Sequence, residues 1–161
     1  MEAELKIKNK KLLGYVIKSV NIPDGVTHIG NSAFSGCSNL KSVTIPDSVT
    51  SIEQCVFSGC SSLKDITIPD SVRYIWSGAF YRCRSLARVT IPDSVTSIGI
   101  CTFSGCTSLT EVRIPDSVSS IGDHTFANCT SLKSIKIPNW FTDEDVKKWE
   151  IPDTCEVVRR N

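Results

Sequence analysis

The stretch IPDSVTSIEQCVFSGCSSLKDIT, from Ile45 to Thr67, decides the fold, because it is one copy of a pattern that returns every 23 residues. The copies follow one another without insertion or deletion, and each opens on an Ile-Pro pair: Ile22-Pro23, Ile45-Pro46, Ile68-Pro69, Ile91-Pro92, Ile114-Pro115 and Ile137-Pro138. A fixed period of this size indicates a stacked repeat fold, since a single copy is too small to bury its own apolar face.

Superposing the copies separates positions that stay apolar from positions that vary. We expect the constant apolar positions to face inward and to stack on their own counterparts in neighbouring coils. Three such columns are Phe34, Phe57, Phe80, Phe103 and Phe126; Ile29, Ile52, Ile75, Ile98 and Ile121; and Leu40, Leu63, Leu86, Leu109 and Leu132.

The end of each copy has the pattern of a short strand. In residues 63–68 the side chains alternate between apolar and polar, so that Ile66 and Ile68 point inward and the residues between them outward. Pro69 ends this strand because it lacks an amide hydrogen. A second extended piece is expected at residues 71–75, and one helical turn around Ala79 and Phe80. The glycine that follows such a turn, as at 59 or 105, is expected to end it.

These residues carry a resemblance to a known family. The pattern Leu-x-x-Val-x-Ile-Pro-x-x-Val-x-x-Ile-Gly-x-x-Ala-Phe-x-x-Cys, which runs from Leu40 to Cys60 and returns in each later coil, resembles the BspA-like leucine-rich repeat. The resemblance covers roughly residues 17 to 141. It implies a curved solenoid that binds protein or glycan partners, often on a microbial cell surface, with no enzyme activity and no cofactor.

The predicted fold class is a β-rich α/β repeat: a leucine-rich-repeat solenoid with a parallel sheet face and short helical turns. We expect one domain over residues 1–161, with an N-terminal cap at 1–21, five to six coils at 22–141 and a C-terminal cap at 142–161. The N-terminal cap is predicted as a hairpin. The C-terminal cap is predicted as a helix with Thr142 as its N-cap and a last strand from Glu156, with Trp140, Phe141 and Trp149 covering the final coil.

Net charge and the absence of long apolar runs limit the classes of partner and the cellular locations that we expect. The net charge of +1 gives no general attraction to nucleic acid, and no apolar run is long enough to span a membrane. The N-terminal MEAELKIKNKK lacks the apolar core of a signal peptide, so the chain as written is expected in the cytoplasm. The resemblance implies a secreted or cell-surface protein instead. Caps at both ends oppose end-to-end stacking and favour a monomer.

The chain has eight cysteines, and five of them form a column with the period of the repeat: Cys37, Cys60, Cys83, Cys106 and Cys129. Small buried thiols explain this regularity best. A disulfide framework is the first alternative, although stacked copies point in the same direction and the column has an odd count. A metal site is the second, although no C-x-x-C pair is present. We therefore expect no metal.

The third coil departs from the others and supplies the candidate partner-binding site. It carries large or charged residues where the other coils have small or polar ones: Arg73, Tyr74, Trp76, Tyr81, Arg82, Arg84 and Arg88. Outward strand positions add Thr67, Thr90 and Arg113. Tyr, Trp and Arg are the residue types enriched at binding hot spots. The alternative is neutral variation on a tolerant surface. Glycine and asparagine at the counterparts of Arg82 predict a left-handed backbone there.

The resulting interpretation is a non-enzymatic scaffold that binds a protein or glycan through the outer sheet face and the third coil. A purely structural spacer or assembly subunit is the alternative. An enzyme is disfavoured because acid, base and nucleophile do not cluster in a cleft. Cys101, Asp123 and His124 come together if the coils stack, but they lie on a packed layer. No catalytic residue and no cofactor is expected.

Overall fold

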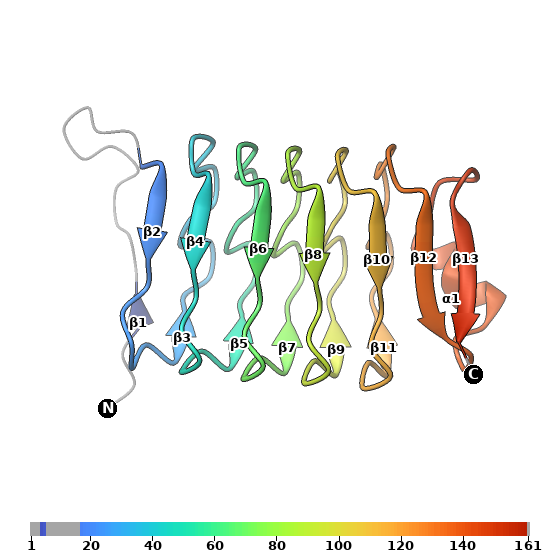
Figure 1. Cartoon of the computed structure of the whole chain (residues 1–161), viewed down its shortest axis with the longest axis horizontal. Coiled ribbons are helices and arrows are strands. Elements are labelled where there is room, and N and C mark those ends of the chain that lie inside the picture. Colours follow the sequence, from blue (N-terminus) through green and yellow to red (C-terminus); the bar gives the residue numbers. More distant parts are fainter. Residues whose placement is uncertain (1–3, 6–16, 161) are drawn as a thin grey trace.

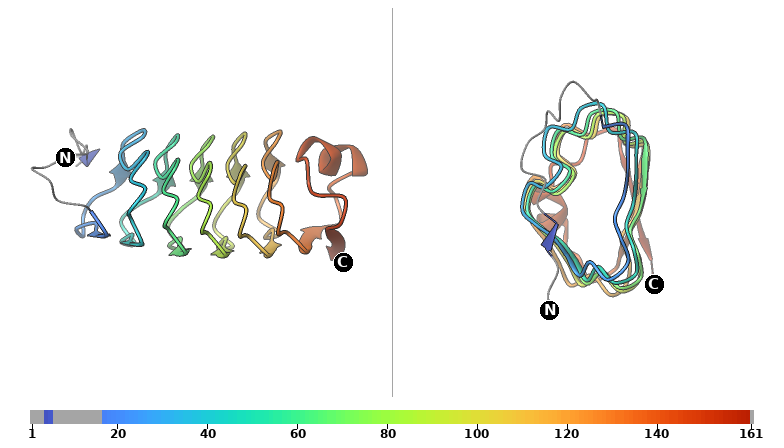
Figure 2. Two further views of the ribbon diagram at one scale, coloured as in Figure 1. Left: turned by 90° about the horizontal axis from the view of Figure 1, so that it is seen from above. Right: turned by 90° about the vertical axis from the view of Figure 1, so that its left-hand side faces the viewer.

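The computed structural model describes residues 4–5 and 17–160, which form an elongated solenoid with its coils stacked along one axis (Figure 1). Seen along this axis, successive coils superimpose as one oval ring around the apolar interior (Figure 2). This confirms the predicted solenoid. It follows from the constant period, because equal coils stack with equivalent residues in register.

Each coil contributes to two parallel sheets rather than one. The front face in Figure 1, called the front sheet below, carries the longer strands β2 (Ser19–Asn21), β4 (Ser42–Thr44), β6 (Asp65–Thr67), β8 (Arg88–Thr90), β10 (Glu111–Arg113), β12 (Ser134–Pro138) and β13 (Glu156–Arg160). Of these, β2 and β4 pair with each other, and β6, β8, β10, β12 and β13 form one five-stranded sheet. The back sheet contains the two-residue strands β1 (Glu4–Leu5), β3 (His28–Ile29), β5 (Ser51–Ile52), β7 (Tyr74–Ile75), β9 (Ser97–Ile98) and β11 (Ser120–Ile121). The extended piece predicted at residues 71–75 is therefore present, but its strand is confined to Tyr74 and Ile75.

From β2 to β12, residues that pair between neighbouring coils lie one 23-residue repeat apart. Asp65 lies opposite Arg88 in the front sheet, and Tyr74 lies opposite Ser97 in the back sheet. Within β6, Ile66 is buried while the residues on both sides of it are exposed, as the alternation predicted. A side chain that varies from coil to coil thus always lies beside its own counterparts.

The segment around Ala79 and Phe80 forms tight turns and not the predicted helical turn. The amides of Ala79 and Tyr81 donate to carbonyls three residues back, whereas those of Gly78 and Phe80 donate to carbonyls in the next coil. Since alternate amides are used between coils, a helix cannot propagate. Gly59 and Gly105 do have the left-handed backbone expected of them, with φ of 73° and 75°.

The core is built from the predicted columns. The rings of Phe34, Phe57, Phe80, Phe103 and Phe126 are fully buried and stack with centroids 5.5 to 5.8 Å apart. Beside them, the thiols of Cys60, Cys83, Cys106 and Cys129 donate to the backbone carbonyls of Phe34, Phe57, Phe80 and Phe103 at 3.1 to 3.2 Å. The cysteine column therefore also links each coil to the previous one, which agrees with the interpretation as small buried thiols.

Serine forms a second inter-coil link, at the turn after the Ile-Pro pair. The hydroxyls of Ser48, Ser71, Ser94 and Ser117 donate to the carbonyls of Val26, Val49, Val72 and Val95 at 2.6 to 2.8 Å. Each bond joins one coil to the coil before it and satisfies a carbonyl that the strands leave unpaired.

Thr142 is the N-cap of the C-terminal helix, as predicted. The Thr142 hydroxyl accepts from the Asp145 amide, the Asp145 carboxylate accepts from the Thr142 amide, and α1 (Asp143–Lys148) follows. Phe141 and Trp149 are buried against the final coil, but Trp140 is 51% exposed, so its predicted role in covering that coil is wrong. The hairpin predicted at the N-terminus falls mostly on residues outside the described ones.

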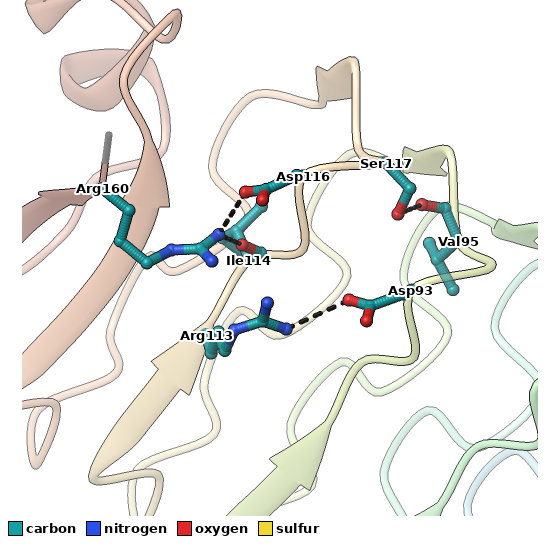
Figure 3. A network of polar contacts seen from close by, with 7 residues as sticks. All are labelled: Asp93, Val95, Arg113, Ile114, Asp116, Ser117 and Arg160. Atoms are coloured by element: carbon teal, nitrogen blue, oxygen red, sulfur yellow. Dashed lines mark hydrogen bonds and ion pairs between the residues drawn. The ribbon is translucent and has the colours of Figure 1, made fainter.

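Arginines fasten the last strand to the solenoid. Arg160 of β13 donates to the Ile114 carbonyl and to the Asp116 carboxylate, the latter at 2.8 Å (Figure 3). Arg159 donates to the Phe141 carbonyl and to Asp143. Within residues 4–5 and 17–160, no helix has the length and apolar character needed to span a bilayer.

Candidate functional site

The ten candidate residues lie on three different surfaces of the solenoid. Thr67, Arg88, Thr90 and Arg113 belong to strands of the front sheet. Arg73, Tyr74 and Trp76 lie in or beside β7 of the back sheet. Tyr81, Arg82 and Arg84 lie in the turns that lead from the back sheet to the front sheet. The third coil therefore presents its unusual residues around its circumference and not as one continuous patch.

On the front sheet, opposite charges lie side by side. Arg88 is in register with Asp65 on one side and with Glu111 on the other. Lys136 pairs with Glu111 at 2.8 Å. Arg113 pairs with Asp93 at 3.1 Å, as Figure 3 shows. Exposed pairs of this kind contribute about 0–1 kcal/mol to stability. They leave a face of mixed charge with a row of threonines.

The back sheet carries an apolar groove, which we call the aromatic groove. It has a volume of about 270 Å³, and its prominent side chains are Tyr74, Trp76 and Ile100, which are 46%, 49% and 52% exposed. The rings of Tyr74 and Trp76 have centroids 6.1 Å apart and are tilted by 35°. Large apolar side chains grouped on a surface mark interaction sites more often than single exposed ones.

A step in side-chain size between neighbouring coils creates the aromatic groove. Trp76 has Gly99 and Gly122 as its counterparts in the next two coils, and all three positions line the groove. A Cβ on Gly99 would lie 2.4 Å from the Ser77 amide nitrogen, so only glycine fits at position 99. The floor beside Trp76 is consequently bare backbone.

Sequence reasoning missed Ile100 as a member of this site. Its counterparts are Asn31, Gln54, Ser77 and Asp123, all of them polar. Comparison of equivalent positions could have identified Ile100 as the one apolar residue among polar ones. An isolated isoleucine is normally taken for a buried core residue, however, and only the fold shows that position 100 faces solvent.

The turns of the third and fourth coils enclose a second, polar groove, which we call the arginine groove. It has a volume of about 360 Å³ and is lined by Tyr81, Arg82, Arg84, Ser104, Gly105, Thr107 and Asn128. The Arg82 guanidinium lies over the Tyr81 ring, 5.0 Å from its centroid. Arg82 has a φ of 56°, which confirms the predicted left-handed backbone.

Of Cys101 and His124, which stacking was expected to bring together, His124 pairs with a carboxylate from the C-terminal cap, that of Glu150. His124 Nδ1 lies 2.9 Å from Glu150 Oε1, and the Cys101 amide donates to the Asp123 carbonyl one coil on. Burial and then the Glu150 charge raise the pKa of the Cys101 thiol. The Cys101 thiol therefore lacks the lowered pKa that marks an activated cysteine nucleophile.

Metal binding finds no support in the same region or elsewhere in the described chain. Among the described residues, no three His, Cys, Asp or Glu side chains are grouped so that they could hold an ion. All of the sequence-predicted residues except Arg73 lie in one of the two grooves or on the front sheet.

Comparison with known proteins yields a family and several structures. The family model for the BspA type leucine-rich repeat region matches the chain in six copies, over residues 6–99 and 75–152. The crystal structure of a leucine-rich repeat protein from T. pallidum has 32% identity and a TM-score of 0.73, over 89% of this chain and 74% of that one. No curated protein matches the chain.

A second similar structure is that of a leucine-rich cell surface protein from Faecalibacterium prausnitzii. It has 26% identity and a TM-score of 0.69, over 91% of this chain and 48% of that one. The present chain thus spans about half of the F. prausnitzii protein.

Proposed function

Because this chain belongs to the BspA-type leucine-rich repeat family, we propose that it is a non-enzymatic scaffold that recognises a protein or glycan partner. The observation that carries the proposal is the aromatic groove, where Tyr74, Trp76 and Ile100 are each about half exposed and adjacent. Burying such side chains against a partner yields about 25 cal/mol for every Å² of apolar surface removed from water.

A place on the cell surface, with an adhesion-type role, fits the same proposal. The F. prausnitzii protein of similar fold is described as a cell surface protein, and this description supports a cell-surface location for the present chain. The front sheet offers a separate polar surface through Thr67, Thr90, Arg88 and Arg113, whose counterparts in adjacent coils lie in register beside them.

The aromatic groove can be removed with residues that other coils already use. The double variant Tyr74→Ser/Trp76→Gly gives the third coil the residue types that the fourth coil has at the equivalent positions, Ser97 and Gly99. The matched control is Trp140→Ser, which removes a tryptophan of equal exposure outside the groove. Both variants and the parent are tested on a glycan array and against a displayed peptide library.

We expect the targets of the parent to lose at least tenfold in affinity with the double variant and to be retained by the control, as at a hot spot. Equal binding of the same targets by the parent and the double variant would show that the aromatic groove is not the recognition site. A parent that selects no target in either library would contradict the proposed function itself.

A further inference from the structure

The turns that precede the front sheet carry positive charge without any compensating acid. We call these turns the turn ridge: residues 35–41, 58–64, 81–87, 104–110 and 127–133, along the upper edge of Figure 1. They contain no Asp or Glu, and their cations, all exposed, are Lys41, Lys64, Arg82, Arg84 and Lys133. The whole chain, by contrast, has 18 Lys and Arg against 17 Asp and Glu. The turn ridge therefore carries five cations without an acid among its residues, whereas the chain as a whole is nearly neutral.

The stacking places like charges beside one another on this edge. The Lys41 amide donates to the Lys18 carbonyl at 2.7 Å, so these two lysines occupy equivalent positions in adjacent coils. Lys64 continues the row one coil further on. Adjacent coils are about 4.8 Å apart, and like charges directly opposite each other are unfavourable. A bound anion would relieve this repulsion.

The arginine groove lies in the middle of the turn ridge and has the form of an anion site. Arg82 and Arg84 both line it, and the stacking of Arg82 on Tyr81 limits the freedom of one guanidinium. Guanidinium groups bind carboxylates and other planar or tetrahedral oxyanions through paired hydrogen bonds. The hydroxyl and amide side chains of Ser104, Thr107 and Asn128 complete the lining.

From this arrangement we propose that the turn ridge binds an acidic glycan, a sugar chain that carries carboxylate or sulfate groups. Arg82 and Arg84 hold one acidic group in the arginine groove, and the lysines of the neighbouring coils contact further groups along the chain. The inference rests on the proposed function and narrows its partner to one chemical class.

The lining favours a glycan over the other polyanions. Single-stranded nucleic acid needs aromatic faces on which bases stack, but the ring of Tyr81 is covered by Arg82. An acidic peptide would meet the same two arginines, but the rest of the lining offers hydroxyl and amide groups and no apolar pocket for its alternate side chains. Hydroxyl and amide groups beside two cations match a ligand that is itself rich in hydroxyls and acids.

The test uses the full chain with heparin as the sulfated probe, polygalacturonate as the carboxylated probe and dextran as the neutral one. The key variant is Arg82→Gly/Arg84→Ser, which installs the residues of the second coil, Gly59 and Ser61. Since glycine suits the left-handed backbone at position 82, this variant is expected to fold at least as stably as the parent. Lys147→Gln/Lys148→Gln removes two exposed cations from α1 and controls for net charge.

We expect the parent to bind at least one acidic probe and not dextran, with an affinity that falls as salt is raised. The groove variant should lose at least tenfold in affinity, and the helix variant less than threefold. Equal losses in both variants would overturn the proposal, because they would show attraction to net charge alone. Tighter binding of an Asp-rich peptide or of oligo(dT) than of either acidic glycan would also overturn it.

Failure of the acidic-glycan inference can be distinguished from failure of the proposed function. The variant Tyr74→Ser/Trp76→Gly leaves the turn ridge intact, so its binding to the acidic probe tests the ridge alone. A ridge that fails while the aromatic groove still selects targets would refute only the acidic-glycan inference.

Discussion

Arg82 and Gly105, one coil apart, share a left-handed backbone, and the side chain of Arg82 needs the space that Gly105 leaves open. Their φ angles are 56° and 75°, and Arg82 Cγ lies 3.0 Å from the place that a Cβ on Gly105 would occupy. The arginine therefore occupies space that is open only because its counterpart has no side chain. The third coil gained a cation at the expense of backbone strain.

Replacing Arg82 with glycine should therefore stabilise the protein. A residue with a Cβ at this backbone conformation costs about 1 kcal/mol more than glycine, so Arg82→Gly is expected to raise the free energy of unfolding by about that amount. Urea denaturation at neutral pH measures it. Asn128→Gly, at a φ of 59° that asparagine tolerates better, should give a smaller gain. An Arg82→Gly protein less stable than the parent would contradict the inference that the backbone at Arg82 is strained.

The phenylalanine column predicts that position within the stack determines the cost of a deletion. Phe80 stacks on Phe57 and Phe103, each at 5.5 Å, whereas Phe34 stacks only on Phe57 among the described residues. Phe80→Ala should destabilise by about 3–5 kcal/mol because it opens a cavity between two coils. Phe34→Ala should cost about 1 kcal/mol less, because one ring contact fewer is lost. Equal costs in urea denaturation would argue against coupling through the rings.

The buried thiols predict a loss of stability at alkaline pH. Burial raises the pKa of Cys129 to about 12, and it raises the pKa values of Cys83 and Cys106 as well. In the unfolded chain a thiol ionises near 9, so above that pH the unfolded state binds fewer protons than the folded one. Each buried thiol should then lower the free energy of unfolding by up to about 1.4 kcal/mol per pH unit, from pH 9 towards pH 12.

The measurement compares the parent with Cys129→Ala in urea at pH 8, 9, 10 and 11. The variant loses the bond to the Phe103 carbonyl and is less stable at pH 8, but its stability should fall less steeply above pH 9. Identical slopes would show that Cys129 ionises in the folded state as readily as in the unfolded one. As a control, Ser62→Ala, on the turn ridge, should leave the slope unchanged.

The attachment of the last strand predicts a local effect of Arg160. Its guanidinium contacts the Ile114 carbonyl and Asp116, and hydrogen bonds to a charged group contribute about 1.5–3 kcal/mol each. Arg160→Gln should raise the amide hydrogen-exchange rates of β13 by about tenfold or more, with little change in the first coils. Asp116→Asn, which removes only an exposed partner, should have a smaller effect. A uniform increase along the chain would contradict local attachment.

Much of the fold was predictable because the repeat compares the chain with itself. Constant columns revealed the buried phenylalanines, and glycine at positions 59 and 105 revealed the backbone of Arg82. The helical turn was predicted wrongly because periodicity cannot show that alternate amides bond to the next coil. A second set of equivalent positions with a left-handed backbone was missed; its residues are Ser32, Cys55, Cys101 and His124, at φ of 54–58°. The sequence gives little indication of this conformation, because only the third coil has glycine, Gly78, at that position.

The candidate site was less predictable than the fold. The sequence placed Tyr74, Trp76, Arg82 and Arg84 in one unusual coil, but it could not show that they face different directions around that coil. Nor could it predict the aromatic groove, which depends on the missing side chain at position 99 as much as on the tryptophan at 76. Each groove is formed by residues of several coils, whereas an unusual residue can be recognised from the sequence of a single coil.

The constant register of the coils has a consequence for how such a molecule can be altered. A cassette from Ile68 to Thr90 begins and ends at equivalent points of the backbone, so it can be removed, duplicated or moved without creating a new junction. The aromatic groove and the arginine groove both include residues of the third and fourth units. Changing the order of units would therefore build new recognition surfaces from parts that already fold.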